Sequence, residues 1–176
     1  GVQTCALPIY MKDGILLRQV INEIDESVDF TEYKERHAFG EIYETILKDL
    51  QSAGNAGEFY TPRAVTDFMA QALAPKLGET VADFACGTGG FLTSALKILD
   101  SQVQTPADRE LYARSVYGIE KKQLPYLLCV TNMLLHDIDN PEVFHDNSLE
   151  KDVREWKHKP DGQFDVVLMI PPYGGS

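Results

Sequence analysis

A glycine-rich segment, DFACGTGG at positions 83–90, is the part of the sequence best suited to binding chemistry. It follows an apolar run and precedes a helical pattern, which predicts a strand, a turn and a helix in succession. Glycines in such a turn let the backbone approach a ligand, and the helix N-terminus offers unpaired N–H groups to an anion. We expect a ligand here, with a tight packing turn as the alternative.

The spacing of this turn does not match a nicotinamide dinucleotide site. A G-x-G-x-x-G fingerprint that begins at Gly87 would need a third glycine where Leu92 stands. The next acidic residue at a predicted strand end, Glu120, lies much further along the chain than the roughly 20 residues typical of such sites. Asp83 before the turn and Glu120 after the next strand instead favour a nucleoside with an amino-acid tail. Glu120 would hold the ribose hydroxyls, and the turn would hold the tail.

The elements that would position these residues follow from the spacing of apolar side chains. Helical spacing recurs over 14–28 and 39–50, and Thr61 with Pro62 predicts the N-cap and first turn of a helix that ends near residue 75. Strands and helices then alternate, with strands within 81–86, 115–120, 142–149 and 164–170 and helices at 91–100, from 106 and at 124–138. This alternation predicts an α/β fold with a parallel sheet and helices on both faces.

Composition limits the classes of protein that fit. The chain has 176 residues, 44% of them hydrophobic, which suffices for one domain with a sizeable core. Its three cysteines form no CxxC pair, which argues against a zinc site or disulfide framework and for a reducing cytoplasm. A net charge of −11 argues against a free-standing DNA-binding domain. If the protein acts on DNA, most phosphate contacts should come from another segment or a partner.

The first nine residues, GVQTCALPI, are what a common sequencing-library adapter would encode, so we expect residues 1–9 to be non-native. An ordinary disordered N-terminus is the alternative.

Five stretches, in this order, resemble the modification (M) subunit of type I restriction–modification systems: GEFYTPRAV, ADFACGTGGFL, YGIEKKQ, NSL and DVVLMIPPYGG. The resemblance runs from about Phe39 to the end. It implies an S-adenosylmethionine-dependent DNA adenine-N6 methyltransferase, with DNA and the specificity (S) and restriction (R) subunits as partners. It also implies a doubly wound Rossmann-like sheet, incomplete here, preceded by a helical segment. Residues 10–57 would end an N-terminal helical domain, and residues 58–176 would be the cofactor-binding half of the methyltransferase domain.

The resemblance also implies roles for particular residues. A lid over the cofactor would come from the segment before the first helix of the α/β part, the amino-acid end would be held by the turn, and the adenine would lie after the third strand. Glu120 would bind the ribose. The lid residues are Glu58, Phe59, Tyr60, Thr61, Pro62 and Arg63; the turn residues are Asp83, Ala85, Cys86, Gly87, Thr88 and Gly89; the adenine residues are Asp146 and Asn147.

The catalytic motif of the family falls on Ile170, Pro171, Pro172 and Tyr173, and it departs from the pattern at its first position. The family has asparagine or aspartate there, whose oxygen and the next carbonyl accept hydrogen bonds from the target amino group. The aromatic residue stacks on the flipped base. The side chain of Ile170 cannot accept a hydrogen bond, so we expect this chain to transfer methyl groups poorly or not at all. A single-base read error at this codon is the mundane alternative.

Two other functions stay open at this point. One is a methyltransferase of the same motif type that acts on protein glutamine or on RNA. The other is a non-catalytic, cofactor-binding scaffold subunit, which Ile170 favours. Asn132 and His136 lie four apart on a predicted helix, and we expect them on its solvent side rather than at a metal.

Overall fold

The computed structural model describes residues 13–27, 29, 38–40, 42, 43, 45, 47, 61–150 and 163–171. The chain forms two compact units, Gly1–Ala38 and Phe39–Ser176. In the first, helix α1 spans Gly14–Ser27 and confirms the predicted helix. A carboxylate oxygen of Asp13 accepts a hydrogen bond from the N–H of Ile15 at 2.8 Å, which caps the helix start.

The second unit is built on a parallel sheet of four short strands, β1 (Val81–Asp83), β2 (Val116–Glu120), β3 (Glu142–His145) and β4 (Val166–Val167). Their order is β3-β2-β1-β4, and every pair is parallel. The chain therefore moves outward from β1 to β3 and then returns to the other side of β1. This reversal is the topological switch point of a doubly wound, Rossmann-like sheet, and it confirms the predicted fold class.

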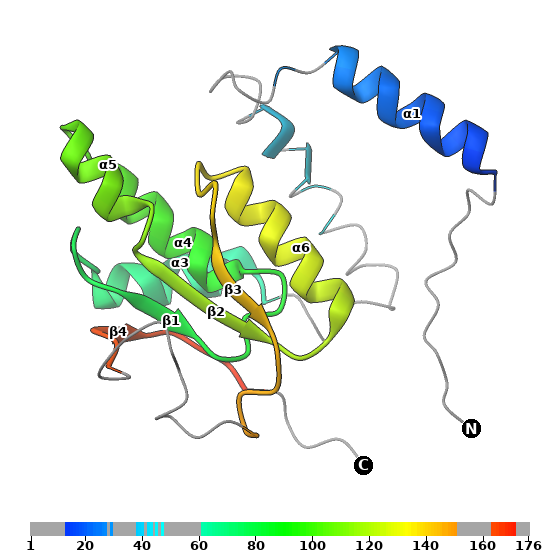
Figure 1. Ribbon diagram of the computed structural model, residues 1–176. Helices are drawn as coiled ribbons and strands as arrows, with labels where there is room; N and C mark the ends of the chain where they lie inside the picture. The colour runs from blue at the N-terminus through cyan, green and yellow to red at the C-terminus, as the bar shows by residue number, and fades with distance from the viewer. Residues whose placement is uncertain are drawn as a thin grey trace. The chain divides into compact units, whose positions relative to one another are not determined.

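Among the described residues, α3 (Arg63–Leu73), α4 (Gly90–Asp100), α5 (Pro106–Tyr112) and α6 (Gln123–Leu134) contact the sheet or one another. Figure 1 shows α4, α5 and α6 together on one side of the strands. The core between these helices and the sheet is apolar, and its buried members include Leu92, Leu96, Leu99, Val116, Met133 and Val143. The described part of the segment predicted to be helical at 39–50 is helical and packs on α6, where the Tyr43 hydroxyl donates to the Leu128 carbonyl at 2.7 Å.

The other face of the sheet carries an aromatic cluster. Tyr117 of β2 lies 5.3 Å from Phe144 and 4.8 Å from Phe164, measured between ring centroids. Phe84 and Phe164 make an edge-to-face contact at 5.5 Å. Among the described residues the helices cover one face only, so helices on the second face stay a prediction.

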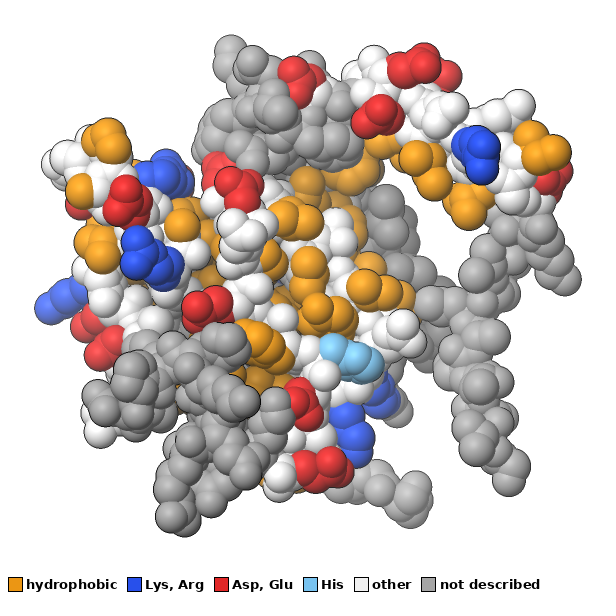
Figure 2. All heavy atoms as spheres, viewed as in Figure 1, with side chains coloured by type: hydrophobic (Ala, Val, Ile, Leu, Met, Phe, Trp, Pro, Cys, Tyr) orange, Lys and Arg blue, Asp and Glu red, His pale blue; other side chains and the backbone are white. Residues whose placement is uncertain are grey.

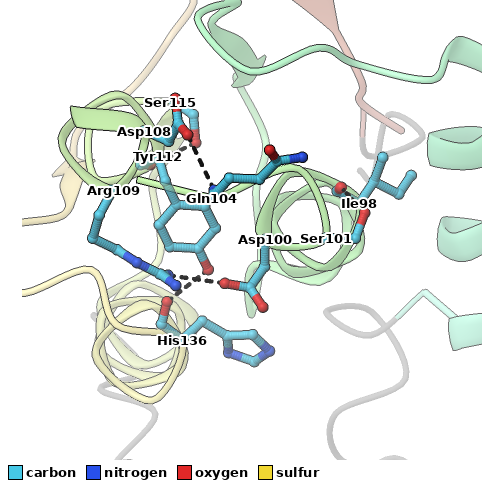
Figure 3. A network of polar contacts seen from close by, with 9 residues as sticks. All are labelled: Ile98, Asp100, Ser101, Gln104, Asp108, Arg109, Tyr112, Ser115 and His136. Atoms are coloured by element: carbon cyan, nitrogen blue, oxygen red, sulfur yellow. Dashed lines mark hydrogen bonds and ion pairs between the residues drawn. The ribbon is translucent and has the colours of Figure 1, made fainter. Parts of the chain in front are cut away.

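Helix α5 is fastened at the end of the sheet opposite the glycine-rich turn. Thr105 and Asp108 form a capping box at its start, which confirms the helix predicted from Thr105-Pro106. Figure 3 shows how the helix is held: Arg109 pairs with Asp100 of α4 at 2.9 Å, and the Tyr112 hydroxyl donates to the His136 carbonyl at 2.8 Å. These contacts join α4, α5 and the end of α6.

Two local predictions were wrong. Thr61 is not the N-cap of α3, because the helix begins one residue later, with Pro62 at the N-cap and no side-chain capping bond. Helix α6 ends at Leu134 rather than near Ile138, since Asp137 adopts a left-handed φ of 62°.

The surface of the described part is mixed in charge. Figure 2 shows acidic and basic side chains scattered over one face and hydrophobic side chains gathered over α6, where Leu127 and Leu134 are exposed. In the described ranges no helix is long and apolar enough to cross a membrane.

Candidate functional site

The glycine-rich turn links the end of β1 to the start of α4 and is closed by backbone bonds. The N–H of Cys86 donates to the Ile119 carbonyl at 3.0 Å, and the N–H of Gly89 donates to the Cys86 carbonyl at 2.7 Å. Gly87 and Gly89 have φ angles of 55° and 83°, a region that favours glycine. The predicted strand–turn–helix unit is therefore present, with α4 beginning at Gly90.

Glu120 ends β2 beside this turn, and its carboxylate is bonded to it. One carboxylate oxygen accepts a hydrogen bond from the N–H of Gly87 at 2.9 Å, and the other accepts from the N–H of Lys122 at 2.7 Å. Each carboxylate oxygen can accept a second bond. The structure thus brings together two predicted residues that are far apart in the chain, with acceptor capacity left for hydroxyl groups.

Asp83 is buried at the end of β1, with 1% of its surface exposed. Its carboxylate accepts a hydrogen bond from the N–H of Ala85 at 3.0 Å. Burial raises the pKa of Asp83 to about 7, against the lowering effect of the Ala85 bond and with a smaller push from the charge of Glu120. A buried carboxyl with a raised pKa beside a glycine-rich turn is typical of functional sites. Such a carboxyl can pair with a cationic group of a ligand.

The loop after β3 joins the same edge of the sheet. The N–H of Asp146 donates to the Glu120 carbonyl at 3.0 Å, and the N–H of Asn147 donates to a carboxylate oxygen of Asp146 at 2.7 Å. The Asn147 amide also donates to Glu150 at 2.7 Å. Asp146 therefore lies next to Glu120, with Asn147 beside it, and their contact with an adenine stays a prediction.

Helix α6 packs against the turn. A Cβ atom added to Gly89 would lie 2.8 Å from the Cys129 sulfur and 3.1 Å from the terminal methyl of Met133. The amide of Asn132 donates to the Thr88 carbonyl at 3.1 Å. Asn132 is 1% exposed, so its predicted place on the solvent side was wrong; it lies on the buried face that Cys129 and Met133 also form.

Cys86 belongs to the turn, but its thiol belongs to the core. Two effects raise the pKa of Cys86 well above its usual value. The larger is a hydrogen bond with the Cys129 thiol, and the smaller is burial. Any contact of Cys86 with a ligand would therefore run through its backbone.

Arg63, the last of the predicted lid residues, reaches the first turn of α4. Its guanidinium donates to the Gly90 carbonyl at 2.9 Å and to the Thr93 hydroxyl at 2.6 Å. Thr61 and Pro62 precede it directly, while Glu58, Phe59 and Tyr60 lie outside the described residues. These contacts place Arg63 beside the glycine-rich turn.

The predicted catalytic stretch begins at the same edge of the sheet. The N–H of Leu168 donates to the Ala82 carbonyl at 2.9 Å, which sets β4 beside β1, and Ile170 follows two residues later with 38% of its surface exposed. Pro171 is exposed, and Pro172 and Tyr173 lie outside the described residues. Ile170 therefore lies across the switch point from the glycine-rich turn, where ligands of such sheets bind.

Together these groups fit a nucleoside that carries a charged amino-acid tail. The structure brings the Asp83 carboxyl and the Glu120 carboxylate to this turn, and Glu120 keeps acceptor capacity for hydroxyl groups. Most N–H groups of the turn are bonded within the protein. Within the described ranges no cluster of His, Cys, Asp and Glu could hold a metal ion. Asn132 and the anchoring of Arg63 on α4 were not predicted; the only sequence signal for Asn132 was its position on an otherwise apolar helix.

Comparison with known proteins finds similar proteins over most of this chain. The profile of the N-6 DNA methylase family matches residues 34–176. The methylase subunit of the Escherichia coli type I restriction enzyme EcoEI is 57% identical over 169 residues, which cover 95% of this chain and 34% of that protein. The methylase subunit of the Mycoplasma pneumoniae enzyme MpnII is 32% identical, over 91% of this chain and 30% of its own.

A solved structure described as explaining complex assembly and conformational transition of the type I R-M system is also similar. It superposes with a TM-score of 0.82 at 36% identity and covers 93% of this chain and 33% of its own. The chain thus spans about a third of the length of the relatives it matches.

Proposed function

The chain belongs to the N-6 DNA methylase family, and from this premise we propose that its second unit binds S-adenosylmethionine for methyl transfer to adenine N6 in DNA. The bond between the Glu120 carboxylate and the N–H of Gly87 carries the proposal, because it joins the ribose-binding acid to the glycine-rich turn. S-Adenosylmethionine supplies an electrophilic methyl group on a sulfonium sulfur when bound.

The chain's own residues would divide the binding between them. Glu120 accepts from the two ribose hydroxyls, and the backbone from Ala85 through Cys86, Gly87 and Thr88 to Gly89 surrounds the amino-acid end. Asp83, whose pKa burial raises to about 7, ionises when an ammonium group lies beside it. Asp146 and Asn147 flank the adenine.

Residues Glu58 to Arg63 would cover the cofactor from the side of α3. Arg63 supports this role through its bonds to Gly90 and Thr93, which tie the end of that segment to α4. Because it touches the helix start, Arg63 would act by holding the segment in place as much as by touching the cofactor.

Adenine would be received beyond β4. The Pro171 carbonyl would accept from the target amino group, and Tyr173 would stack on the flipped base. The Ile170 side chain offers no acceptor, which removes one of the two groups that would orient the nitrogen lone pair. We therefore propose that transfer is slow in this chain.

The partners follow the same reasoning. The relatives are subunits of restriction enzymes, so DNA and the specificity and restriction subunits are the proposed partners, and the bacterial cytoplasm is the proposed location. Restriction–modification names also favour DNA over glutamine or RNA as substrate. Ile170 still favours one second candidate, a subunit that binds the cofactor without transferring the methyl group.

Cofactor binding is the first test. Isothermal titration of the 176-residue chain with S-adenosylmethionine should show one site, and Glu120→Gln should weaken it by about tenfold, since one carboxylate–hydroxyl bond contributes about 1.5 kcal/mol. Glu110→Gln, at an exposed position of α5, is the matched control and should leave the affinity unchanged. Absence of binding, or equal affinity for wild type and Glu120→Gln, would contradict the proposal.

A further inference from the structure

Helix α6 presents one buried polar side chain to the glycine-rich turn. Asn132 is 1% exposed and lies between the apolar Cys129 and Met133 on the same helix face. Its amide nitrogen donates to the Thr88 carbonyl at 3.1 Å. A buried amide costs free energy unless it is bonded, so an apolar residue would fill this position at lower cost if packing were its only role.

The bond fixes a single peptide plane. The Thr88 carbonyl and the Gly89 N–H belong to the same peptide group, and the N–H donates to the Cys86 carbonyl at 2.7 Å. Both ends of this peptide are therefore held, one by α6 and one by the turn itself. A peptide group bonded at both ends does not rotate, whereas glycine on its C-terminal side would otherwise permit rotation.

Side-chain packing also restricts the backbone at Gly89. Gly89 has a φ of 83°, and the Cys129 sulfur and Met133 methyl leave no room for a Cβ atom there. Next to it, Arg63 of α3 donates to the Gly90 carbonyl at 2.9 Å. Two carbonyls that flank Gly89, those of Thr88 and Gly90, are thus bonded to side chains of neighbouring helices.

We propose that Asn132 is a positioning residue for the amino-acid end of the cofactor: it holds the Thr88–Gly89 peptide in the orientation that the tail requires. This inference rests on the proposed cofactor function. Asn132 touches the turn and not the ligand, so its effect is on preorganisation of the backbone.

The test compares two ligands that differ in the tail alone. S-Adenosylhomocysteine has the amino-acid tail, and 5′-methylthioadenosine lacks it. Asn132→Leu keeps the branched shape of the side chain and removes the donor, so titration of the full chain should show about tenfold weaker binding of S-adenosylhomocysteine. Binding of 5′-methylthioadenosine should stay within about twofold of wild type. Equal loss for both ligands, or no loss for either, would overturn the proposal.

Thr131→Val is the matched control. Thr131 is the neighbouring residue on α6, and its hydroxyl donates within the helix to the Leu127 carbonyl at 2.9 Å. This variant should bind both ligands as wild type does. If Asn132→Leu does not fold, Asn132→Ser replaces it, because a serine hydroxyl is too short to span the distance to the Thr88 carbonyl.

Amide hydrogen exchange separates this inference from the proposed function. In the ligand-free chain the Gly89 amide should exchange faster in Asn132→Leu than in Thr131→Val, since the peptide loses one of its two anchors. Unchanged exchange overturns the role of Asn132 whether or not the cofactor binds. Failure of the wild-type chain to bind S-adenosylhomocysteine, with faster Gly89 exchange in the variant, would contradict the cofactor function and leave the turn anchored as described.

Discussion

Asp83 is the residue whose chemistry depends most on where the fold places it. Its pKa rises from 3.8 to about 7 because burial disfavours the charged form. The folded chain then binds this proton more tightly than the unfolded chain does. The contribution of Asp83 to the free energy of unfolding is therefore largest in acid and falls as pH rises from about 4 to 7, by at most about 1.4 kcal/mol per pH unit.

Asp83→Asn should remove that part of the pH dependence, because an amide does not titrate. Urea unfolding at several pH values between about 4 and 8 measures the slope for wild type and variant. Asp25→Asn, on the exposed helix α1, is the control and should keep the wild-type slope. Parallel curves for wild type and Asp83→Asn would show that the buried carboxyl does not govern the slope.

Gly89→Ala should destabilise the chain by about 2–4 kcal/mol, since it combines a left-handed φ with a Cβ placed 2.8 Å from the Cys129 sulfur. Cys129→Ala makes room for that Cβ. In a double-mutant cycle the paired substitutions should cost at least about 1 kcal/mol less than their sum. Additive costs would show that the backbone angle alone accounts for the loss.

Some of the site residues could be predicted from the sequence, and others could not. Asp83, Glu120 and the turn could be predicted because residue type, strand ends and glycine spacing are all visible in the sequence. Asn132 could not, because which face of a helix is buried depends on neighbours far away in the chain. An isolated polar residue on an apolar helix predicts exposure, whereas Asn132 is buried and its amide donates to the Thr88 carbonyl.

At the scale of elements, α3 and α4 meet through hydroxyl groups rather than through an apolar contact alone. Ser94 of α4 donates to a carboxylate oxygen of Asp67 at 2.6 Å, and its oxygen lies 2.9 Å from that of Thr66. Thr66 and Ser94 are both buried. Each hydroxyl would lose a partner if the other were removed.

Ser94→Ala should therefore lower the free energy of unfolding by about 1–3 kcal/mol. The double variant Thr66→Val with Ser94→Ala should lose less free energy of unfolding than the sum of the two single variants. Ser101→Ala, whose exposed hydroxyl donates to the Ile98 carbonyl at 2.7 Å, should stay within about 0.5 kcal/mol of wild type. Denaturant unfolding of these variants measures the differences. A double variant as costly as the sum would contradict a shared polar contact.

Element types could be predicted more reliably than element ends. Periodicity identified the helices α1, α4 and α6, and the Thr105-Pro106 pair identified α5, but the strands are shorter than their apolar runs. In β1 the run extends to Cys86, whereas strand pairing ends at Asp83. The length of a strand depends on its partner strands, which the apolar run does not show. The turn residues after Asp83 include apolar ones because they pack on the core, as Cys86 does.

At the scale of the whole molecule, Ile170 bears on whether the protein transfers methyl groups to DNA. In a chimera, residues 61–176 would replace the matching segment of the EcoEI methylase subunit and be assayed with its partners and tritiated S-adenosylmethionine. Ile170→Asn should increase the rate of methyl transfer to DNA by on the order of 10²–10³, since it restores one positioned acceptor.

Val167→Ala on β4 is the control for that assay and should not raise the rate. Equal rates for the chimera with Ile170 and the chimera with Ile170→Asn would show that the backbone carbonyl alone orients the amino group. A chimera that binds the cofactor and stays inactive in both forms would favour the scaffold function.

The buried carboxyl of Asp83 has a consequence for how ligand binding exchanges protons with solvent. Because burial raises its pKa to about 7, the group still carries protons at neutral pH. A ligand that brings an ammonium to it would lower that pKa and release protons on binding. The released proton is taken up by the buffer, so the heat of binding should differ between phosphate and Tris while the affinity stays the same.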